Sequence, residues 1–412
     1  MANIKPFKAI RPRKDLAHRI AALPYDVYNR QEAKIEVEKE PLSFLKIDRA
    51  ETQFSDDVDT YDDRVYQRAR DTLYSMLHEG EFIQDSEEYY YIYELIMDGR
   101  SQNGIVACAS IDDYENNIIK KHENTRKEKE IDRIRHVDTC EAQTGPIFLA
   151  YRGNEQIQDI IEQVKQGDKL YGFTSPDGIT HNIWVIEDEK SIAKLREIFE
   201  TMDSIYIADG HHRTASAVRV GQMRRSDNPE YDGSEEFNFF LSVLFPDNQL
   251  LIQPYNRVVK SLNGNSKDQF LAKVSDNFHI EEVGSQAFAP NKKGTFGMYL
   301  DNSWYKLSIK EELINLNDPV ESLDVSILQD YLLEPILGIK DPKTDDNIDF
   351  IGGIRGLKEL ERRVAEDMEV AFSMYPTSME ELFAVSDAGA LMPPKSTWFE
   401  PKLRSGLFIH KI

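Results

Sequence analysis

The chain has 412 residues, of which 40% are hydrophobic and 30% are charged, a balance typical of a globular protein with more than one lobe. Fifty basic residues against 73 acidic ones give a net charge of −23, which argues against binding nucleic acid or an anionic membrane. Two cysteines are too few for a disulfide scaffold or a four-cysteine zinc site. No segment has the length of a membrane span or the apolar core of a signal peptide, so we expect a cytoplasmic protein.

The first acidic loop in chain order is the segment ALPYDV, residues 22–27. Its Pro-Tyr-Asp sequence predicts a loop with Asp26 near the tip. Asp26 either caps the polar helix expected over residues 30–39 or belongs to a substrate site, and the local sequence favours neither. After it we expect a short strand at 44–47 and a helix over 56–80.

Residues 89–97 and 104–111 are rich in β-forming side chains and flank an Asp-Gly turn signal, which predicts a β-hairpin. The next segment, residues 118–144, is the most basic of this acidic chain. Its sequence predicts a strand end at His122 and Glu123 that leads into a capped helix. Two interpretations stay open for its cations: a solvated helix with salt bridges, or a set of partners for phosphoryl oxygens. These cations are Lys120, Lys121, His122, Arg126, Lys127, Lys129, Arg133, Arg135 and His136.

The organising segment is SIYIADGHHRTASAV, residues 204–218. Ile205 and Ile207 alternate with polar or small residues, which predicts a half-buried strand. Gly210 allows a sharp turn and a close approach of the backbone to a ligand. The small and apolar residues from Thr214 onward are suited to start a helix.

This strand-to-helix corner gathers the ionisable residues Asp209, His211, His212 and Arg213. The beginning of a helix has free N–H groups and a partial positive charge, so it is suited to an anion. Arg213 adds a planar fork of donors that matches phosphate or carboxylate. The alternative is a tight turn with a solvated charged cluster. We favour the binding site because perturbed ionisable groups gather at functional sites.

The second half of the chain carries fewer chemical signals. Residues 250–260 predict a strand interrupted by Pro254, with Asn256 and Arg257 facing a pocket. The last segment, residues 391–412, places Lys395, Ser396, Thr397 and later Lys402 beside prolines, where lysines and hydroxyls would bind anionic oxygens. The alternative for this segment is a buried β-hairpin with its lysines outside.

The order of elements predicts an α/β protein of mixed α+β type. We expect a main α/β body over residues 1–260, a smaller α/β subdomain over 261–320, and a C-terminal helical and hairpin segment over 321–412 that returns to the site. The sequence contains no Walker loop, no Rossmann glycine fingerprint and no zinc-protease motif.

Several segments together resemble a large family of bacterial and archaeal proteins of unknown function that are often labelled SpoOJ/ParA/ParB/RepB-like. The matching segments span nearly the whole chain: ALPYDV at 22–27, KHENT at 121–125 with Asp132-Arg133, TGPIF at 144–148, YIADGHHR at 206–213, QPYNRVV at 253–259, LDVSILQDYLLEPILGI at 323–339 and MPPKSTWFEPKL at 392–403.

The Asp-Gly-His-His-Arg corner resembles the phosphate-binding corner of the ParB/sulfiredoxin-like fold, which includes nucleotide hydrolases, sulfiredoxin and free-serine kinases. The resemblance implies a ParB/sulfiredoxin-like core elaborated with further α/β subdomains, and serine or phosphoserine as a substrate. It gives phosphate-handling roles to Asp209, His211, His212 and Arg213, and supports functional roles for His122, Glu123 and Arg133. Partition-type DNA binding needs a helix-turn-helix module and a basic face, and neither is visible in the sequence.

These observations predict a small-molecule phosphotransferase that uses Mg²⁺ with ATP or ADP. The expected catalytic residues are Asp209, His211, His212 and Glu123. The expected phosphate ligands are Gly210, Arg213, Thr214, His122, Arg133, Lys395, Ser396, Thr397 and Lys402, and the substrate ligands are Asp26, Asn256 and Arg257. The alternatives are a non-catalytic regulator that binds a nucleotide or a phosphorylated metabolite, and a phosphatase. The residues that hold the metal and the oligomeric state stay open.

Overall fold

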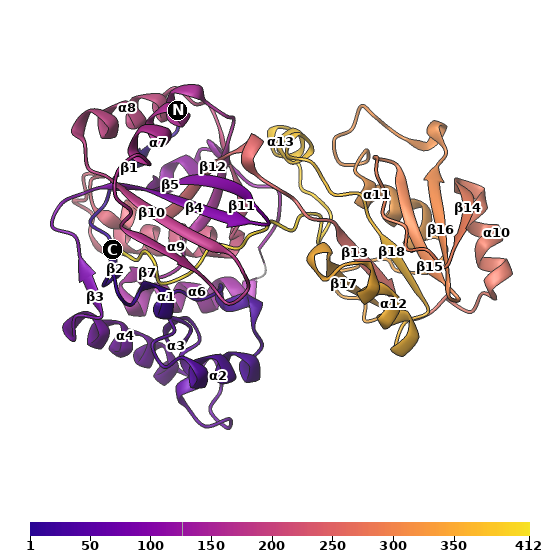
Figure 1. The fold of residues 1–412 in the computed structure, drawn as a ribbon, viewed down its shortest axis with the longest axis horizontal. Helices are drawn as coiled ribbons and strands as arrows, with labels where there is room; N and C mark the ends of the chain where they lie inside the picture. Colours follow the sequence, from indigo (N-terminus) through magenta and orange to yellow (C-terminus); the bar gives the residue numbers. More distant parts are fainter. Residues whose placement is uncertain (126) are drawn as a thin grey trace. The chain divides into compact units, whose positions relative to one another are not determined.

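The structure is a computed structural model that describes residues 1–125 and 127–412, so Arg126 of the basic segment lies outside the described residues. The chain forms two compact units (Figure 1). The first comprises Met1–Leu250 together with Pro401–Ile412, and the second comprises Leu251–Glu400. This division differs from the expected one, because residues 251–260 belong to the second unit and only the end of the tail belongs to the first.

The first unit is built on a nine-stranded mixed sheet with the order β6-β11-β8-β12-β5-β4-β10-β9, and β1 pairs with β5. The predicted hairpin is confirmed as β4 and β5, and its turn residues Asp98 and Gly99 have φ values of 51° and 79°. At the other end of the sheet, β11 is antiparallel to β8 and parallel to β6. The strands of this sheet are β1 (Ile4–Lys5), β4 (Tyr90–Met97), β5 (Arg100–Ser110), β6 (Ile119–Lys120), β8 (Ile147–Tyr151), β9 (Tyr171–Thr174), β10 (Thr180–Ile186), β11 (Ile205–Asp209) and β12 (Phe239–Pro246).

A second layer of the first unit packs helices around a separate apolar cluster that includes Phe44, Leu73 and Phe82. Residues 44–47 were expected to form a strand, and this prediction is wrong, because α3 (Leu45–Asp48) packs on α4 instead. A four-residue apolar run has no periodicity of its own, so the tertiary packing decides its structure. The helices of this unit include α1 (Ala17–Ile20), α2 (Arg30–Lys39), α4 (Asp63–His78), α5 (Ile111–Glu115), α6 (Lys127–Cys140), α7 (Glu155–Val164), α8 (Glu189–Glu200) and α9 (His211–Asp227).

Two short strand pairs complete the first unit. They are β2 (Ile10–Pro12) with β3 (Phe82–Gln84), and β7 (Ala142–Gln143) with β19 (His410–Lys411). The second pair fastens the end of the tail to the segment that precedes β8. The tail therefore pairs with residues far earlier in the sequence instead of forming a hairpin with itself.

The second unit has one antiparallel six-stranded sheet with the order β14-β16-β15-β18-β13-β17. Residues 261–320, expected to form a separate subdomain, share this sheet with later strands because β15 pairs with β18. Trp304 and Leu360 lie in its core. Its elements include β13 (Tyr255–Val259), α10 (Lys267–Asn277), β14 (Phe278–Gly284), β15 (Thr295–Leu300), β16 (Ser303–Ile309), α11 (Asp324–Leu328), β17 (Ile348–Gly352), α12 (Leu357–Glu366), β18 (Val370–Ser373) and α13 (Met379–Asp387).

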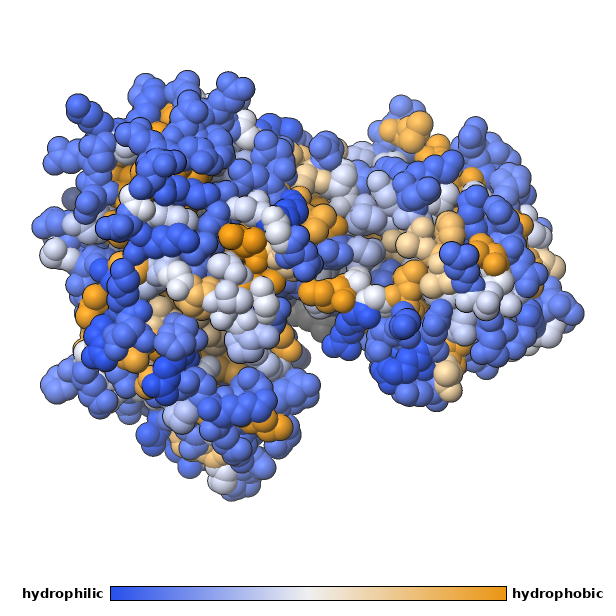
Figure 2. Space-filling view, viewed as in Figure 1, coloured by the Kyte–Doolittle hydropathy of each residue, from blue (hydrophilic) through white to orange (hydrophobic). Residues whose placement is uncertain are grey.

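The expected α/β class of mixed type is confirmed by these two sheets and their helices. Hydrophilic residues cover most of the visible face of each unit (Figure 2), as the large number of charged residues requires. None of the helices in the described part of the chain combines the length and the apolar character that a bilayer crossing requires.

Candidate phosphate-binding corner and neighbouring pocket

The strand-turn-helix corner predicted around residue 210 is present. Strand β11 ends at Asp209, and the 17-residue helix α9 begins at His211, earlier than the expected start near Thr214. Gly210 joins them with φ 96°, a left-handed conformation that glycine adopts without steric cost. The Thr214 hydroxyl donates to the Gly210 carbonyl oxygen at 3.1 Å, so it is already bonded within the first turn of the helix.

The N-terminus of α9 has no capping side chain, and its first turn contains no acidic residue. Arg213 folds back over Gly210, so that a Cβ atom added at residue 210 would lie 3.2 Å from both Nε and Nη2 of Arg213. Arg213 also donates from Nη1 to the carbonyl oxygen of Pro146. The free N–H groups, the partial positive charge of the helix end and the guanidinium therefore lie together.

Asp209 accepts hydrogen bonds from two groups: Lys402 Nζ at 2.8 Å and its neighbour Gly210 N at 2.8 Å. Burial alone would raise the pKa of Asp209, but the Lys402 ammonium and the Arg213 guanidinium outweigh it and hold the pKa well below its usual range. The Asp209 side chain retains 31% exposure. It is therefore an ionised carboxylate with access to solvent.

His122 and His211 pack edge to face, with ring centroids 4.5 Å apart and an angle of 89° between the rings. Both side chains are buried. Burial lowers the pKa of His122 to about 4, although Asp209 opposes this effect. Burial and the neighbouring His122 lower the pKa of His211 well below its usual value. Both rings are therefore neutral near pH 7 and can bind a ligand by hydrogen bonds but not by charge.

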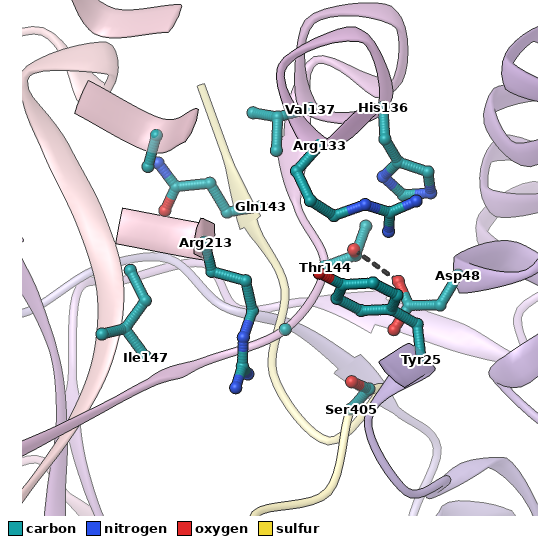
Figure 3. Close-up of a pocket in the computed structure, with 12 residues that line it drawn as sticks. Tyr25, Asp48, Arg133, His136, Val137, Gln143, Thr144, Ile147, Arg213 and Ser405 are labelled. Carbon is teal, nitrogen blue, oxygen red and sulfur yellow. Dashed lines mark hydrogen bonds between the residues drawn. The ribbon is translucent and has the colours of Figure 1, made fainter. Parts of the chain in front are cut away.

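A pocket lies beside the corner, and the space within it that no atom fills is about 440 Å³ when the open solvent at its mouth is counted. Figure 3 shows Arg213 on one side of this space, Tyr25 and Asp48 on the other, and Ser405 at its lower edge. Of the predicted site residues, only Arg133 and Arg213 line it. The full lining is Tyr25, Asp48, Arg133, His136, Val137, Gln143, Thr144, Gly145, Ile147, Arg213, Ala217 and Ser405.

Several polar groups of the pocket are held in place by short contacts. The Thr144 hydroxyl donates to Asp48 Oδ1 at 2.7 Å. Arg133 pairs with Asp132 at 2.9 Å and lies over the Tyr25 ring at 4.1 Å from its centroid. Burial opposes the charge of Arg133, but Asp132 and other neighbours raise its pKa above its usual value, so it is a permanent cation. This cation has a counterion inside the protein, and its role as a phosphate ligand stays a prediction.

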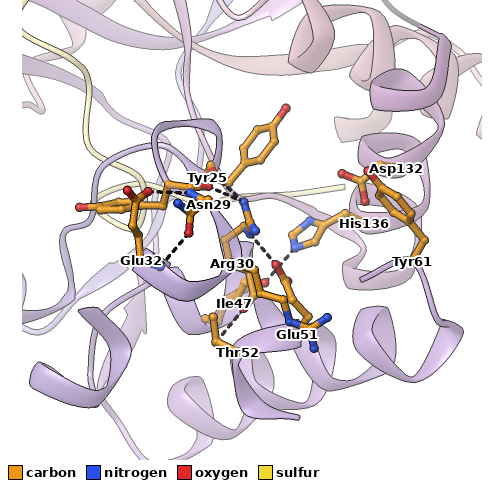
Figure 4. A network of polar contacts seen from close by, with 12 residues as sticks. Tyr25, Asn29, Arg30, Glu32, Ile47, Glu51, Thr52, Tyr61, Asp132 and His136 are labelled. Carbon is orange, nitrogen blue, oxygen red and sulfur yellow. Dashed lines mark hydrogen bonds and ion pairs between the residues drawn. The ribbon is translucent and has the colours of Figure 1, made fainter. Parts of the chain in front are cut away.

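A polar network supports the loop that carries Tyr25 (Figure 4). Arg49 donates to the carbonyl oxygens of Tyr25 and Tyr28 at 3.1 and 2.8 Å. The cap of α2 is Asn29, which forms a reciprocal capping box with Glu32. The sequence left open that Asp26 caps this helix, and that alternative is wrong. Asn29, three positions later, has the extended backbone that a cap requires. Asp26 itself is exposed in the short 3₁₀ turn Tyr25–Val27.

The remaining predicted residues fall into two groups. Glu123 and His212 belong to the first unit and are partly exposed. The second unit contains Asn256, Arg257, Lys395, Ser396 and Thr397.

Three of these second-unit side chains are bonded to the backbone. Asn256 Oδ1 accepts from Met374 N at 3.0 Å, the Ser396 hydroxyl donates to Pro393 O at 2.6 Å, and Arg257 Nη2 donates to Lys395 O at 3.1 Å. Burial lowers the pKa of Arg257 to about 10. Ser396 and Arg257 thus organise the loop that precedes the tail, whereas Asn256 bonds the chain just after β18.

No group of three or more His, Cys, Asp or Glu side chains suited to a metal ion occurs in the part of the chain that the structure describes. Mg²⁺ in nucleotide sites is usually held by one or two carboxylates, phosphate oxygens and water. A single accessible carboxylate, Asp209, is compatible with that arrangement.

A family described as "Protein of unknown function (DUF1015)" matches residues 4–326. The chain belongs to this family. All of the lining residues except Ser405 lie within the matched range, and five of them come from the segments ALPYDV, TGPIF and Asp132-Arg133 that carried the resemblance. Lys402 and Ser405 lie beyond it. No signal in the sequence pointed to Asp48 or Ser405.

A search of curated proteins found no match to the chain. Among solved structures, a mutant free serine kinase in complex with ADP has 13% identity and a TM-score of 0.36, over 74% of this chain and 92% of that one. SbnI from Staphylococcus aureus with a C-terminal truncation has 10% identity and a TM-score of 0.39, over 74% and 86%. A conserved hypothetical protein from Pyrococcus furiosus has 14% identity and a TM-score of 0.34, over 74% and 94%. These values are too low to establish a shared fold or activity.

Proposed function

We propose that this protein is a small-molecule phosphotransferase and that the phosphates of a nucleotide bind at Gly210–Thr214. The observation that carries the proposal is the uncapped beginning of α9, with Arg213 folded over a left-handed Gly210. Such a helix end offers free N–H donors and a partial positive charge to anionic oxygens. The resemblance of the Asp-Gly-His-His-Arg motif to the ParB/sulfiredoxin-like corner supports the same assignment.

Phosphoryl transfer depends mainly on positioning and on neutralising the charge of the moving group. Arg213 and Lys402 are the cations of this corner. Asp209 is ionised, and its lowered pKa makes it a poor proton acceptor, because an effective general base has a pKa near the working pH. We therefore assign Asp209 to Mg²⁺ and to orienting the phosphates. Mg²⁺, bound with ATP or ADP, would neutralise phosphate charge.

The acceptor requires a group that orients or deprotonates its hydroxyl. Glu123 and Asp26 are the proposed carboxylates for this role, and both lie in the first unit. His211 and His212 are proposed hydrogen-bond donors to phosphate. Serine and phosphoserine remain the substrates that the family resemblance implies. The roles of Asn256, Arg257, Lys395, Ser396 and Thr397 stay predictions.

The test is turnover by the purified full chain. It would be mixed with Mg²⁺, ATP or ADP and a panel of hydroxy amino acids, and phosphorylated products would be followed by phosphorus NMR and mass spectrometry. We expect a phosphorylated amino acid, and we expect Arg213→Ala to abolish its formation. Arg219→Ala is the matched control, since Arg219 is an exposed arginine on the same helix.

Two other outcomes would replace the proposal. Nucleotide binding without turnover for any acceptor would identify a regulator that senses a nucleotide. Release of inorganic phosphate from phosphoserine without a nucleotide would identify a phosphatase. Equal nucleotide affinity in wild type and Arg213→Ala would place the phosphate site elsewhere.

A further inference from the structure

Two opposite charges line the pocket without neutralising each other. Asp48 and Arg213 both face the empty space, yet among the ion pairs of the described residues neither of them takes part in one. Arg133, which lines the same pocket, is by contrast paired with Asp132. Buried or partly buried charges are ordinarily paired, because removing them from water costs free energy. Asp48 lies near the Arg133 cation and Arg213 lies near the Asp209 carboxylate, but among the described residues neither forms a direct ion pair, so both can still contact a ligand in the pocket.

The two charges are held apart by the chain itself. Asp48 is fixed by the hydroxyl of Thr144, and Arg213 lies against the next residue, Gly145, where an added Cβ would be 3.6 Å from its Nη1. Gly145 keeps the space between them open.

One hydroxyl group lies on each side of this space. The Ser405 hydroxyl would lie 3.2 Å from a Cβ added at Gly145, next to Arg213. The Tyr25 side chain approaches from the same side as Asp48 (Figure 3). Both side chains are buried, but neither hydroxyl has a hydrogen-bond partner among the described residues, so each keeps a donor and an acceptor for a ligand in the pocket.

We propose that this pocket binds a small zwitterion with an ammonium group and an anionic group on a short carbon skeleton, such as an α-amino acid or its O-phosphorylated form. The anionic group binds Arg213 and Ser405, and the ammonium group binds Asp48. The pocket would hold the second substrate of the proposed phosphotransferase. Binding of the zwitterion does not depend on the proposed function, but its phosphorylation does. A ligand with a single anionic group would offer no cation to the Asp48 carboxylate, which would then keep the hydrogen bond from Thr144 but gain no charged contact from the ligand.

The direct test is calorimetry with the full chain in the absence of nucleotide. The probes are serine, phosphoserine and alanine, with glycolate and ethanolamine as analogues that carry only one of the two charges. We expect the zwitterions to bind about tenfold or more tightly than either single-charge analogue, since each lost charged contact is worth at least 1.4 kcal/mol, or a factor of about ten. The comparison of serine with phosphoserine decides which anionic group the pocket accepts.

Two variants test the assignment of the pocket. Asp48→Asn keeps an acceptor for Thr144 but removes the charge, and Ser405→Ala removes one hydroxyl; we expect weaker zwitterion binding in both, about tenfold for Asp48→Asn. Asp71→Asn, an exposed site on α4, is the matched control. Thermal unfolding without ligand checks that each variant folds, and nucleotide affinity is measured in the same variants.

The outcomes separate the two proposals. Zwitterion binding that depends on Asp48, with no nucleotide binding at the corner, would support the pocket and refute the phosphotransferase. The inference is wrong if single-charge analogues bind as tightly as zwitterions, if no zwitterion binds, or if both folded variants retain wild-type affinity.

Discussion

Asp209 and Lys402 are 193 residues apart in the sequence and form an ion pair of 2.8 Å at the corner between β11 and α9. The pair links the returning tail to the proposed phosphate site. It also explains why Asp209 stays ionised in a partly buried position. The lysine that pairs with Asp209 therefore comes from the last segment of the chain.

Replacing Lys402 by methionine should weaken the acid dependence of stability. Asp209 has a lowered pKa in the folded protein, so its contribution is present above the unfolded pKa of about 4 and is lost as the pH falls below it. We expect Lys402→Met to lower the free energy of unfolding at pH 7 by about 1 kcal/mol, because both side chains are partly exposed. Urea unfolding between pH 7 and 3 measures both effects. Lys411→Met, an exposed lysine of the same tail, should leave the acid dependence unchanged.

His122 should make the protein less stable below about pH 6.5. Its folded pKa of about 4 lies below the unfolded value, so the unfolded chain binds more protons in this range, and stability falls as the pH falls from about 6.5 to 4. We expect His122→Gln to flatten this part of the profile, by an amount on the order of 2–3 kcal/mol for a pKa change of this size. The exposed His18→Gln is the control. A profile of His122→Gln that matches the wild type would show that the histidine is not buried in the neutral form.

Gly210→Ala should impair ligand binding as well as stability. The left-handed backbone costs an alanine about 1–2 kcal/mol, and the new Cβ would also press on Arg213 at 3.2 Å. Gly99→Ala provides a matched control, since Gly99 has φ 79° but no atom within 4 Å of an added Cβ. Urea unfolding should show a loss in both variants, and the loss should be at least as large for Gly210→Ala because of the contact with Arg213. Only Gly210→Ala should weaken nucleotide binding, as measured by calorimetry.

Arg133→Met should strongly destabilise the first unit. It leaves the buried Asp132 with only the Tyr66 hydroxyl at 2.8 Å, and breaking a buried pair costs about 3–5 kcal/mol. Arg135→Met on the same helix removes a pair whose Asp63 side chain is 91% exposed, and we expect a loss of at most about 1 kcal/mol. Chemical unfolding of the two variants measures the difference. Equal losses would contradict a structural role for Arg133.

The local part of the site could be predicted from the sequence because it depends on neighbouring residues. The alternation of Ile205 and Ile207 and the glycine at 210 were enough for the strand, the turn and the helix. The partners of this corner could not be found in that way. Lys402 was predicted as a phosphate ligand, but its pairing with Asp209 depends on the path of the whole chain.

The pocket illustrates the same limit. Arg133 has the same side chain whether it binds phosphate or pairs with Asp132, and only the tertiary structure shows the pairing. Asp48 lies in a helix that was predicted as a strand, so its position on the pocket wall had no local signal. The boundary between the units follows strand pairing in the second sheet, which composition does not reveal.

The second unit begins and ends at one place. Gln253 N donates to Trp398 O at 2.8 Å, and Ile252 forms an isolated β-bridge with Phe399. The segment that enters the second unit and the segment that leaves it therefore lie side by side. The segment from Leu251 to Glu400 is therefore topologically an insertion that interrupts the first unit without rerouting it. Because its two ends are close together, residues 251–400 could be removed and replaced by a short linker from Leu250 to Pro401. The remaining chain would still contain the corner, the pocket and the tail.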